Sequence, residues 1–343
     1  MRASSPTPAA VSPASATGSG SSALAGSAVR PAPHTNPVLL YAMLGVMMLL
    51  WCGNYLVVKA GYREIDGVTM GVLRVILAAL IMLPIYLVSR WRRPPRRALR
   101  RGDYLILGWL GLLGMALNQV LFIAGLSYTT VGHSSFIVAV GPVNILLFAW
   151  LMGLERLSVN KVAGIALSFA GVAMIAAGHG LNFRDAMLRG DLITLCGSLF
   201  FSLYAVFGKK VAGRYDTMTL CAWNYFLGAL ILLPLAIWRG AQQDWSRVTW
   251  RGWGALFYLA LASSVLAYFI WYWALHHLAA TRIGVVTYIQ PVLGTLLGVY
   301  VLHETFTGQL FLSGVLVLGG VALAEWHPKG ADDEDESVEA IDG

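Results

Sequence analysis

Ten long apolar runs fill the sequence between residues 38 and 326. They lie at 38–58, 67–88, 104–126, 132–152, 160–177, 191–208, 217–237, 253–275, 283–302 and 309–326. A helix of about 20 apolar residues crosses the roughly 30 Å hydrocarbon core of a bilayer. Such a helix also pairs its own backbone amides and carbonyls, which is necessary because lipid offers no hydrogen-bond partners. Because most connections are too short to form a separate domain, the sequence predicts an all-α polytopic membrane protein with ten transmembrane helices.

Too few charged residues are present to cover a soluble core. Only 12% of the 343 residues are charged and 57% are apolar, whereas a soluble domain carries about 25% charged residues. The three cysteines, Cys52, Cys196 and Cys221, lack CxxC spacing and lie in apolar runs. This pattern indicates buried thiols rather than a disulfide framework or a zinc site.

An internal repeat divides the apolar runs into two sets of five. Residues 51–84 and 201–234 align at an offset of 150, with nine identities in 34 pairs, including Asp66/Asp216. Further along, the offset is 149 and pairs Pro142 with Pro291 and Glu155 with Glu304. A period this long corresponds to half of a protein rather than to a solenoid unit.

An odd number of spans in each half has a topological consequence. The second half, at 191–326, must enter the membrane from the side opposite to the first, at 38–177, so the repeats are inverted. Inverted repeats place a substrate site between the halves and provide two related arrangements for alternating access. We therefore expect two inverted five-helix repeats around a central cavity.

The two ends of the chain differ in composition from the rest. Residues 1–36 are rich in Ala, Ser, Pro and Gly and lack the apolar region of a signal peptide. Residues 328–343 form an acidic tail. Neither segment has enough large apolar side chains to build a core, so both are expected to be disordered.

Basic residues predict the orientation. Seven arginines lie between Arg90 and Arg101. Such a cluster could bind nucleic acid, but next to a spanning helix it is typical of a cytoplasmic loop that contacts anionic lipid. With the N-terminus inside, cytoplasmic loops carry 13 basic residues and outer loops carry 7. We expect both termini in the cytoplasm, the bilayer of the inner (plasma) membrane as partner, and no nucleic acid.

Pro142 and Pro291 lie near the middle of their runs. Proline removes a backbone hydrogen bond from the helix interior, and freed carbonyls at this depth are tolerated where they line a cavity. The alternative is a kink that helps helices to pack. Because both halves carry the proline, we expect it to line the cavity.

Polar and aromatic residues within the spans are the other candidates for the cavity lining. They are Trp51, Asn54, Asn118, Tyr204, Tyr268, Tyr288 and Gln290. Each could instead hold helices together by hydrogen bonds or belong to an interfacial aromatic belt. Together they predict an aromatic, polar pocket that suits uncharged, zwitterionic or flat aromatic solutes.

Three cations are gate or charge candidates. Arg74 lies inside a span, where arginine is a functional candidate, although it could contact neighbouring carbonyls or extend toward water. Lys59 and Lys209 end the first helix of each half. They could complement the helix dipole or act as gates at the two mouths. Glu155 and Glu304 are expected to organise tight turns.

Several signals of enzymes and pumps are absent from the sequence. There is no HExxH motif, P-loop or dinucleotide turn, and no Asp or Glu lies deep in a predicted span to serve as a proton relay. We therefore expect no catalytic residues, no metal and no cofactor. Two other classes remain open: a membrane enzyme acting on lipid through His276 and His277, and a sensor acting through the acidic tail.

Four segments resemble the drug/metabolite transporter superfamily, EamA type. They are the run WCGNYLVVK (51–59), the helix from Arg74 to Pro84, the segment from Pro142 to Ser158 and its repeat QPVLGTLLGVYVLHET (290–305). The resemblance covers roughly residues 40–326. It implies ten helices in an inverted repeat around a cavity, and outward movement of amino acids, metabolites or drugs. We expect a secondary transporter that exports small organic metabolites.

Overall fold

A computed structural model describes residues 37–92, 99–155, 157–178, 184–212, 214–278, 283 and 286–325. Every regular element in these ranges is helical. The elements are α1 (Pro37–Gly61), α2 (Gly67–Arg92), α3 (Arg101–Leu110), η1 (Gly111–Asn118), α4 (Gln119–Tyr128), α5 (Val131–Ala139), α6 (Gly141–Leu151), α7 (Val159–Ala177), α8 (Ala186–Ala212), α9 (Thr217–Gln242), η2 (Trp245–Arg247), α10 (Trp250–Ala260), η3 (Leu261–Leu266), α11 (Ala267–His277), α13 (Ile289–Leu302) and α14 (Gly308–Glu325). The two predicted tails and several of the clustered arginines lie outside the described residues.

The prediction of an all-α membrane protein is confirmed. In the described ranges, nine helices are long and apolar enough to cross a bilayer. They include the continuous spans Arg101–Tyr128, Val131–Leu151 and Trp250–Leu275. The remaining apolar helix, α13, is shorter, so the count of ten stays a prediction.

Side-chain caps fix where several helices begin. Asp216 accepts a hydrogen bond from the backbone amide of Thr219 at the start of α9, 3.0 Å away. Ser158 and Thr307, before the starts of α7 and α14, accept from the backbone amides of Lys161 and Leu310 at 3.4 and 3.1 Å. Each cap satisfies one of the backbone amides that a helix N-terminus leaves unpaired.

Two helices contain wide π turns at equivalent places in the repeat. In the first half, η1 starts at Gly111; in the second half, η3 starts at Leu261, 150 residues later. Single π turns inside α-helices are frequent at functional sites. The backbone irregularity is therefore duplicated along with the sequence.

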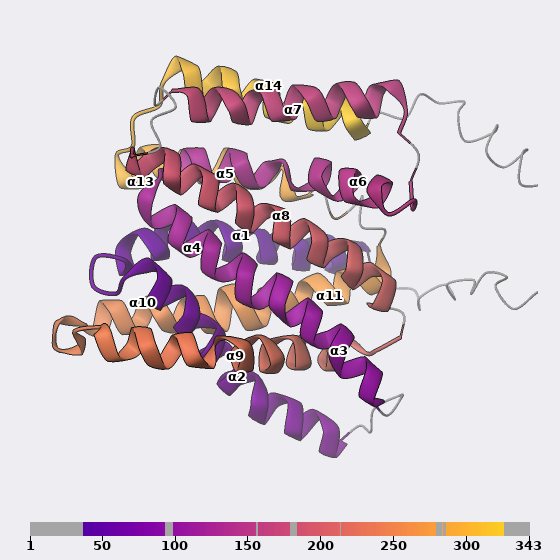
Figure 1. The fold of residues 1–343 in the computed structure, drawn as a ribbon, viewed down its shortest axis with the longest axis vertical. Coiled ribbons are helices and arrows are strands. Elements are labelled where there is room, and N and C mark those ends of the chain that lie inside the picture. Colours follow the sequence, from indigo (N-terminus) through magenta and orange to yellow (C-terminus); the bar gives the residue numbers. More distant parts are fainter. Residues whose placement is uncertain are drawn as a thin grey trace, which may run out of the picture. The chain divides into compact units, whose positions relative to one another are not determined.

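The helices run side by side with alternating direction, so that each has one end at the edge containing the α1–α2 turn and the other at the edge containing the α6–α7 turn (Figure 1). We call these edges the Lys59 end and the Lys209 end, after the lysines near the last turns of α1 and α8. Helices α7 and α14 pack mainly against each other. A methyl group on Gly320 of α14 would lie 2.5 Å from the backbone nitrogen of Ser168 on α7, so only glycine permits this approach.

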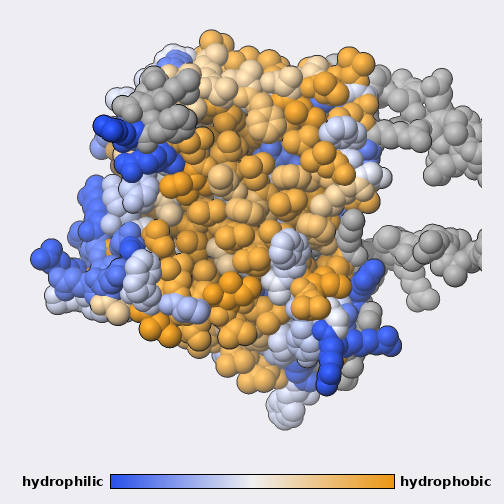
Figure 2. All heavy atoms as spheres, viewed as in Figure 1, coloured by the Kyte–Doolittle hydropathy of each residue, from blue (hydrophilic) through white to orange (hydrophobic). Residues whose placement is uncertain are grey.

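Apolar side chains cover the middle of the face seen in Figure 2, and hydrophilic residues gather at its two edges. Large side chains such as Leu80, Leu230 and Val301 are exposed. A continuous apolar surface of this kind suits lipid rather than water. The charged residues lie where helix ends would meet the headgroups.

Two ion pairs join α2 and α9 at their opposite ends. Near the Lys59 end, Arg239 pairs with Asp66, which also accepts from the amide of Thr69 at 2.9 Å. At the Lys209 end, Arg90 pairs with Asp216 at 2.9 Å. Burial tends to raise the pKa of both carboxyl groups, but hydrogen bonds from the threonines and the arginines outweigh it and hold each pKa below its usual value. The two aspartates are repeat mates, so each half supplies one carboxylate and one arginine.

Candidate functional site

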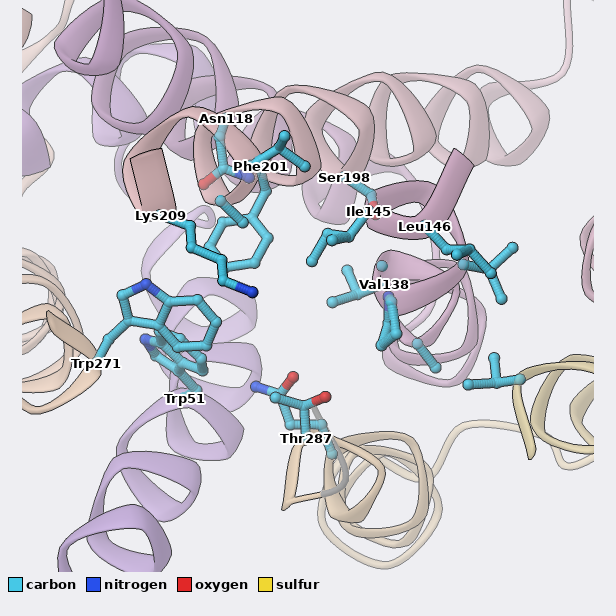
Figure 3. Close-up of a pocket in the computed structure, with 18 of the residues that line it drawn as sticks. Trp51, Asn118, Val138, Ile145, Leu146, Ser198, Phe201, Lys209, Trp271 and Thr287 are labelled. Carbon is cyan, nitrogen blue, oxygen red and sulfur yellow. The ribbon is translucent and has the colours of Figure 1, made fainter. Parts of the chain in front are cut away.

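A cavity of about 530 Å³ lies among the helices and holds most of the predicted site residues. Its lining includes Trp51, Asn54, Asn118, Pro142, Tyr268 and Gln290, together with the predicted cations Arg74 and Lys209. These residues come from α1, α2, η1, α6, α8, α11 and α13, so both halves contribute. Figure 3 shows several of these side chains converging on one space.

Aromatic rings form one wall of the cavity. The ring of Trp51 lies 5.9 Å from that of Trp271 and 6.3 Å from that of Phe201, and the last two are 5.6 Å apart. Figure 3 shows Trp51 and Trp271 together, with Phe201 across from them. The sequence prediction did not choose Phe201 or Trp271 for the site. Phe201 is the repeat mate of Trp51, and that symmetry is the signal that could have found it.

Amides and hydroxyl groups form a polar region beside the rings. The hydroxyl of Tyr268 donates to the side-chain oxygen of Asn118 at 3.3 Å, and the Asn118 amide donates to the carbonyl of Gly197 at 3.0 Å. Asn54 is 5% exposed, and its side-chain oxygen has no hydrogen-bond partner among the described residues. An unpaired buried oxygen is costly, so Asn54 offers an acceptor for a molecule in the cavity.

Arg74 is a buried cation at the edge of this region. Its Nε donates to Ser264 at 2.7 Å, and its Nη2 donates to the hydroxyl and carbonyl of Ser263 at 3.0 and 3.3 Å. Both serines belong to the wide turn η3. No carboxylate in the described ranges forms an ion pair with Arg74. The guanidinium therefore faces the cavity with neutral partners only.

The opposite wall is apolar, and one end of the cavity is lined by charged residues. Val138, Ile145 and Leu146 of α5 and α6 form the apolar wall (Figure 3). At the Lys209 end the lining includes Glu155, Lys161, Lys209 and Glu325. Lys209 is exposed and points into the cavity (Figure 3), whereas Lys161 pairs with Glu155 at 3.3 Å. Because Glu155 and Lys209 are exposed there, we call this end the mouth of the cavity.

Charged side chains join the helices at the Lys59 end. Lys59 donates to the carbonyl of Thr129, the residue that follows α4. Glu304 accepts from the backbone amides of Val131 at 2.9 Å and Gly132 at 3.2 Å, at the start of α5. The predicted turn role of Glu304 thus extends to a contact with another helix. We call these contacts the Lys59 closure.

Lys59, Tyr204, Tyr288 and Pro291 are absent from the cavity lining. Tyr204 is 1% exposed and lies behind the wall, 6.3 Å from the ring of Tyr268. It fits there because Gly114 has no side chain: a methyl group at that position would collide with the Tyr204 ring. Tyr288 packs against the apolar cluster of α5, α7 and α14.

Pro142 lies just after a local interruption of the helix at Val140, within the span Val131–Leu151. The chain leaves the α5 helix at Val140, and α6 starts at Gly141 with the proline in its first turn. Proline is tolerated in a first turn because its missing amide would be unpaired there in any case.

Of the two histidines considered for lipid chemistry, His277 lies with its Nδ1 atom 2.8 Å from the carbonyl oxygen of Trp273.

Comparison with known proteins assigns the family. The model of the EamA-like transporter family matches residues 37–177 and again residues 188–326. The chain belongs to the EamA-like transporter family. Membership makes this protein a multi-pass membrane transporter with a small-molecule substrate, and the two matches agree with the internal repeat seen in the sequence.

Relatives of this EamA-like transporter come from archaea and bacteria. An uncharacterized transporter of Archaeoglobus fulgidus is 30% identical over 288 residues, which cover 82% of this chain and 96% of the relative. A probable amino-acid metabolite efflux pump of Salmonella typhimurium is 25% identical over 283 residues, or 80% and 91% of the two chains. A crystal structure of a protein with 21% identity has a similar fold, with a TM-score of 0.57 over 84% of this chain and 98% of that one.

Proposed function

We propose that this EamA-like transporter exports small organic metabolites, amino-acid derivatives among them, by alternating access of the central cavity. The observation that carries the proposal is a single cavity, built by both halves, with a mouth at one end and the Lys59 closure at the other. A secondary transporter needs such a site, reachable from one side at a time.

The inverted repeat is supported by contacts between repeat mates. Asn118 and Tyr268 are 150 residues apart and share a hydrogen bond. The α2–α9 ion pairs run in reverse order, since the start of each helix is bound to the end of the other. A two-fold axis in the membrane plane relates two copies in this manner. Such an arrangement lets the halves exchange conformations, which alternating access requires.

The substrate class follows from the lining of the cavity. Arg74 lacks a carboxylate partner in the described part of the protein, and a carboxylate from the substrate would supply one with charge-assisted hydrogen bonds. The rings of Trp51, Phe201 and Trp271 would hold an apolar or aromatic portion. The acceptor of Asn54 and the buried, unpaired Nε1 of Trp271 would bind polar groups between them. The Salmonella relative, named as a probable amino-acid metabolite efflux pump, supports the same class.

The proposed direction of transport is supported by the distribution of basic residues. We place the Lys209 end, where the mouth lies, in the cytoplasm, together with both chain termini. The positive-inside rule favours this orientation through the arginines around Arg90–Arg101. In the inner (plasma) membrane the described conformation would then load substrate from the cytoplasm. An exporter needs this loading state.

A reconstituted flux assay tests the proposal. Purified full-length protein in liposomes should move members of a panel of amino acids and N-acylated amino acids down a concentration gradient. Rates should exceed those of empty liposomes and saturate with substrate. A correctly folded protein that moves no member of the panel would refute export of this class.

A further inference from the structure

A histidine–carboxylate pair, with a buried aspartate and a partly buried histidine, lies outside the cavity lining and inside the membrane-spanning helices. The Nδ1 atom of His133 on α5 is 3.0 Å from Oδ2 of Asp191 on α8, and the two side chains are 14% and 3% exposed. The sequence prediction found no deep carboxylate because Asp191 marks the edge of an apolar run at 191–208. The helix in fact starts earlier, at Ala186, which carries Asp191 more than a turn into the span.

The pair is connected directly to the Lys59 closure. The hydroxyl of Thr129 donates to Oδ1 of Asp191, while the carbonyl of the same threonine accepts from Lys59. A few residues later, the amides of Val131 and Gly132 donate to Glu304. The short stretch 129–133 is thus held by charged groups of α1, α8 and the residues after α13. A change of charge at His133 acts on all of these contacts.

Charge counting shows what the protonation of His133 does. Lys59 contributes one positive charge, and Asp191 and Glu304 each contribute one negative charge. With a neutral imidazole the cluster has a net charge of minus one; with an imidazolium it is balanced. Burying unbalanced charge is costly, so the closed arrangement is favoured when His133 holds a proton.

The other ionisable groups on the described helices packed against α5 are exposed or lie at the distant mouth. On α8, Arg189 is exposed. On α4 and α13 the groups are the exposed Tyr128 and Tyr300. Lys161 of α7 and Glu325 of α14 line the distant mouth, α6 carries none, and His303, which follows α13, is exposed.

We propose that His133 and Asp191 form a proton-binding site whose occupancy stabilises the Lys59 closure. The proton binds at Nε2 of His133, Nδ1–H donates to Asp191, and loss of the proton loosens the contacts of Thr129, Lys59 and Glu304. In the transport cycle proposed above, on which only the use of this site depends, a proton taken up from the outer side after substrate release would favour re-closure at the Lys59 end. The proposal supplies a link to a proton gradient that the cavity residues do not provide.

Thiol accessibility tests this proposal without a substrate. Phe122 lines the cavity, so a Phe122→Cys protein with the three native cysteines changed to serine reports whether the cavity opens at the Lys59 end. A membrane-impermeant methanethiosulfonate is added from the Lys59 side between pH 5 and 8.5, and each rate is divided by that of the denatured protein at the same pH. The normalised rate should rise roughly 5- to 10-fold from the acidic to the alkaline end of this series.

Opposite outcomes are expected for the two partners. His133→Gln leaves the cluster with its negative charge at every pH, so labelling should be fast and independent of pH. Asp191→Asn leaves the cluster balanced with a neutral imidazole, so labelling should be slow and flat. His303→Gln, at an exposed histidine of the same end, should retain the parent profile.

A parent-like pH profile in both His133→Gln and Asp191→Asn would overturn the proposal. If either variant fails to fold, infrared difference spectra of the parent test the proton site instead. Imidazolium bands should appear on acidification, and they should belong to a histidine that is shielded from deuterium exchange. Spectra with only exchangeable imidazolium would reject the site. A protein that titrates as expected but moves no solute would keep this site and refute transport, and flux with a flat labelling profile would do the reverse.

Discussion

The hydroxyl of Tyr268 donates to the side-chain oxygen of Asn118 across 3.3 Å, and the two residues occupy the same position in the two copies of the repeat. Asn118 is the last residue of the wide turn η1, and Tyr268 lies two residues after the end of the wide turn η3. The bond therefore joins the halves at the level of the cavity. Both residues also line the cavity, so this contact is part of the wall that a substrate would touch.

Removing this bond should slow transport more than it lowers stability. Tyr268→Phe keeps the ring and loses the hydroxyl, so we expect a stability loss of about 0.5–1.5 kcal/mol. Flux should fall several-fold because the side-chain oxygen of Asn118 loses the partner that joins the two halves, while its amide still donates to Gly197. Liposome flux and thermal unfolding measure the two effects. Tyr300→Phe, at a hydroxyl-bearing ring that is 75% exposed, is the control and should change neither.

Two substitutions of Arg74 should separate the contributions of its charge and of its hydrogen-bond geometry to substrate affinity. Arg74→Gln removes the cation that we expect to hold the substrate carboxylate. Hydrogen bonds to charged groups contribute about 1.5–3 kcal/mol, so apparent affinity should drop roughly 10- to 150-fold. Arg74→Lys keeps the charge but cannot reach both Ser263 and Ser264 with a planar fork, and it should give an intermediate loss. Concentration-dependent flux measures both, and equal affinity in all three proteins would remove Arg74 from the site.

The two lysines should differ in their effect on access. Lys59→Ala deletes the bond to the carbonyl of Thr129, so labelling of Phe122→Cys from the Lys59 side should increase. Lys209 has no hydrogen bond or ion pair in the described part of the chain and points into the cavity. Lys209→Ala should leave that labelling unchanged and alter entry from the mouth instead. Identical labelling in both mutants and the parent would contradict the assignment of gates.

A neighbouring pair of glycines tests the packing of α7 on α14. Gly320→Ala places a methyl group 2.5 Å from the backbone nitrogen of Ser168, which cannot move alone. Such overpacking costs about 1–3 kcal/mol. At Gly319 the nearest side-chain atom would be 4.0 Å away, so Gly319→Ala should be neutral or slightly stabilising. Unfolding in mild detergent measures both, and equal stabilities would show that the contact can relax.

Acid should weaken the α2–α9 ion pairs. The pKa of Asp66 is lowered in the folded protein, so its contribution is complete above the unfolded value near 3.8 and is lost as pH falls through the lower folded value. The repeat mate Asp216 follows the same course. Asp66→Asn and Asp216→Asn should each flatten the fall in thermal stability below about pH 4. A fall as steep as that of the parent in both mutants would mean that other carboxylates govern acid stability.

The sequence predicts the helices better than it predicts their ends. Apolar length alone locates the spans, but α8 starts at Ala186 instead of 191 and α3 starts at Arg101 instead of 104. Polar residues at these ends remain helical because caps such as the Asp103 carboxylate, which accepts from the amide of Arg100 at 2.8 Å, pair the free amides. The wide turns at η1 and η3 have no comparable pattern in their residues, so hydropathy does not predict them.

The sequence also predicts part of the cavity, for an equally physical reason. Trp51 and Asn54 are three residues apart on one helix, and the structure places both in the lining. Tyr204 is also polar and aromatic, but its ring lies behind the cavity wall, where it packs against Gly114. The apolar pattern places Asp191 at the edge of a run, whereas the structure starts α8 at Ala186. Such outcomes depend on which helix faces which, and a single sequence does not contain that information.

The paired wide turns give the cavity a means of changing its lining without breaking a helix. A π turn holds one residue more than an α turn, and each residue advances an α-helix by about 100°. When such a turn migrates along its helix by one residue, the side chain that it passes rotates by about that angle while the rest of the rod stays in place. η1 ends at Asn118 and η3 ends two residues before Tyr268, so each half places such a turn beside the shared cavity.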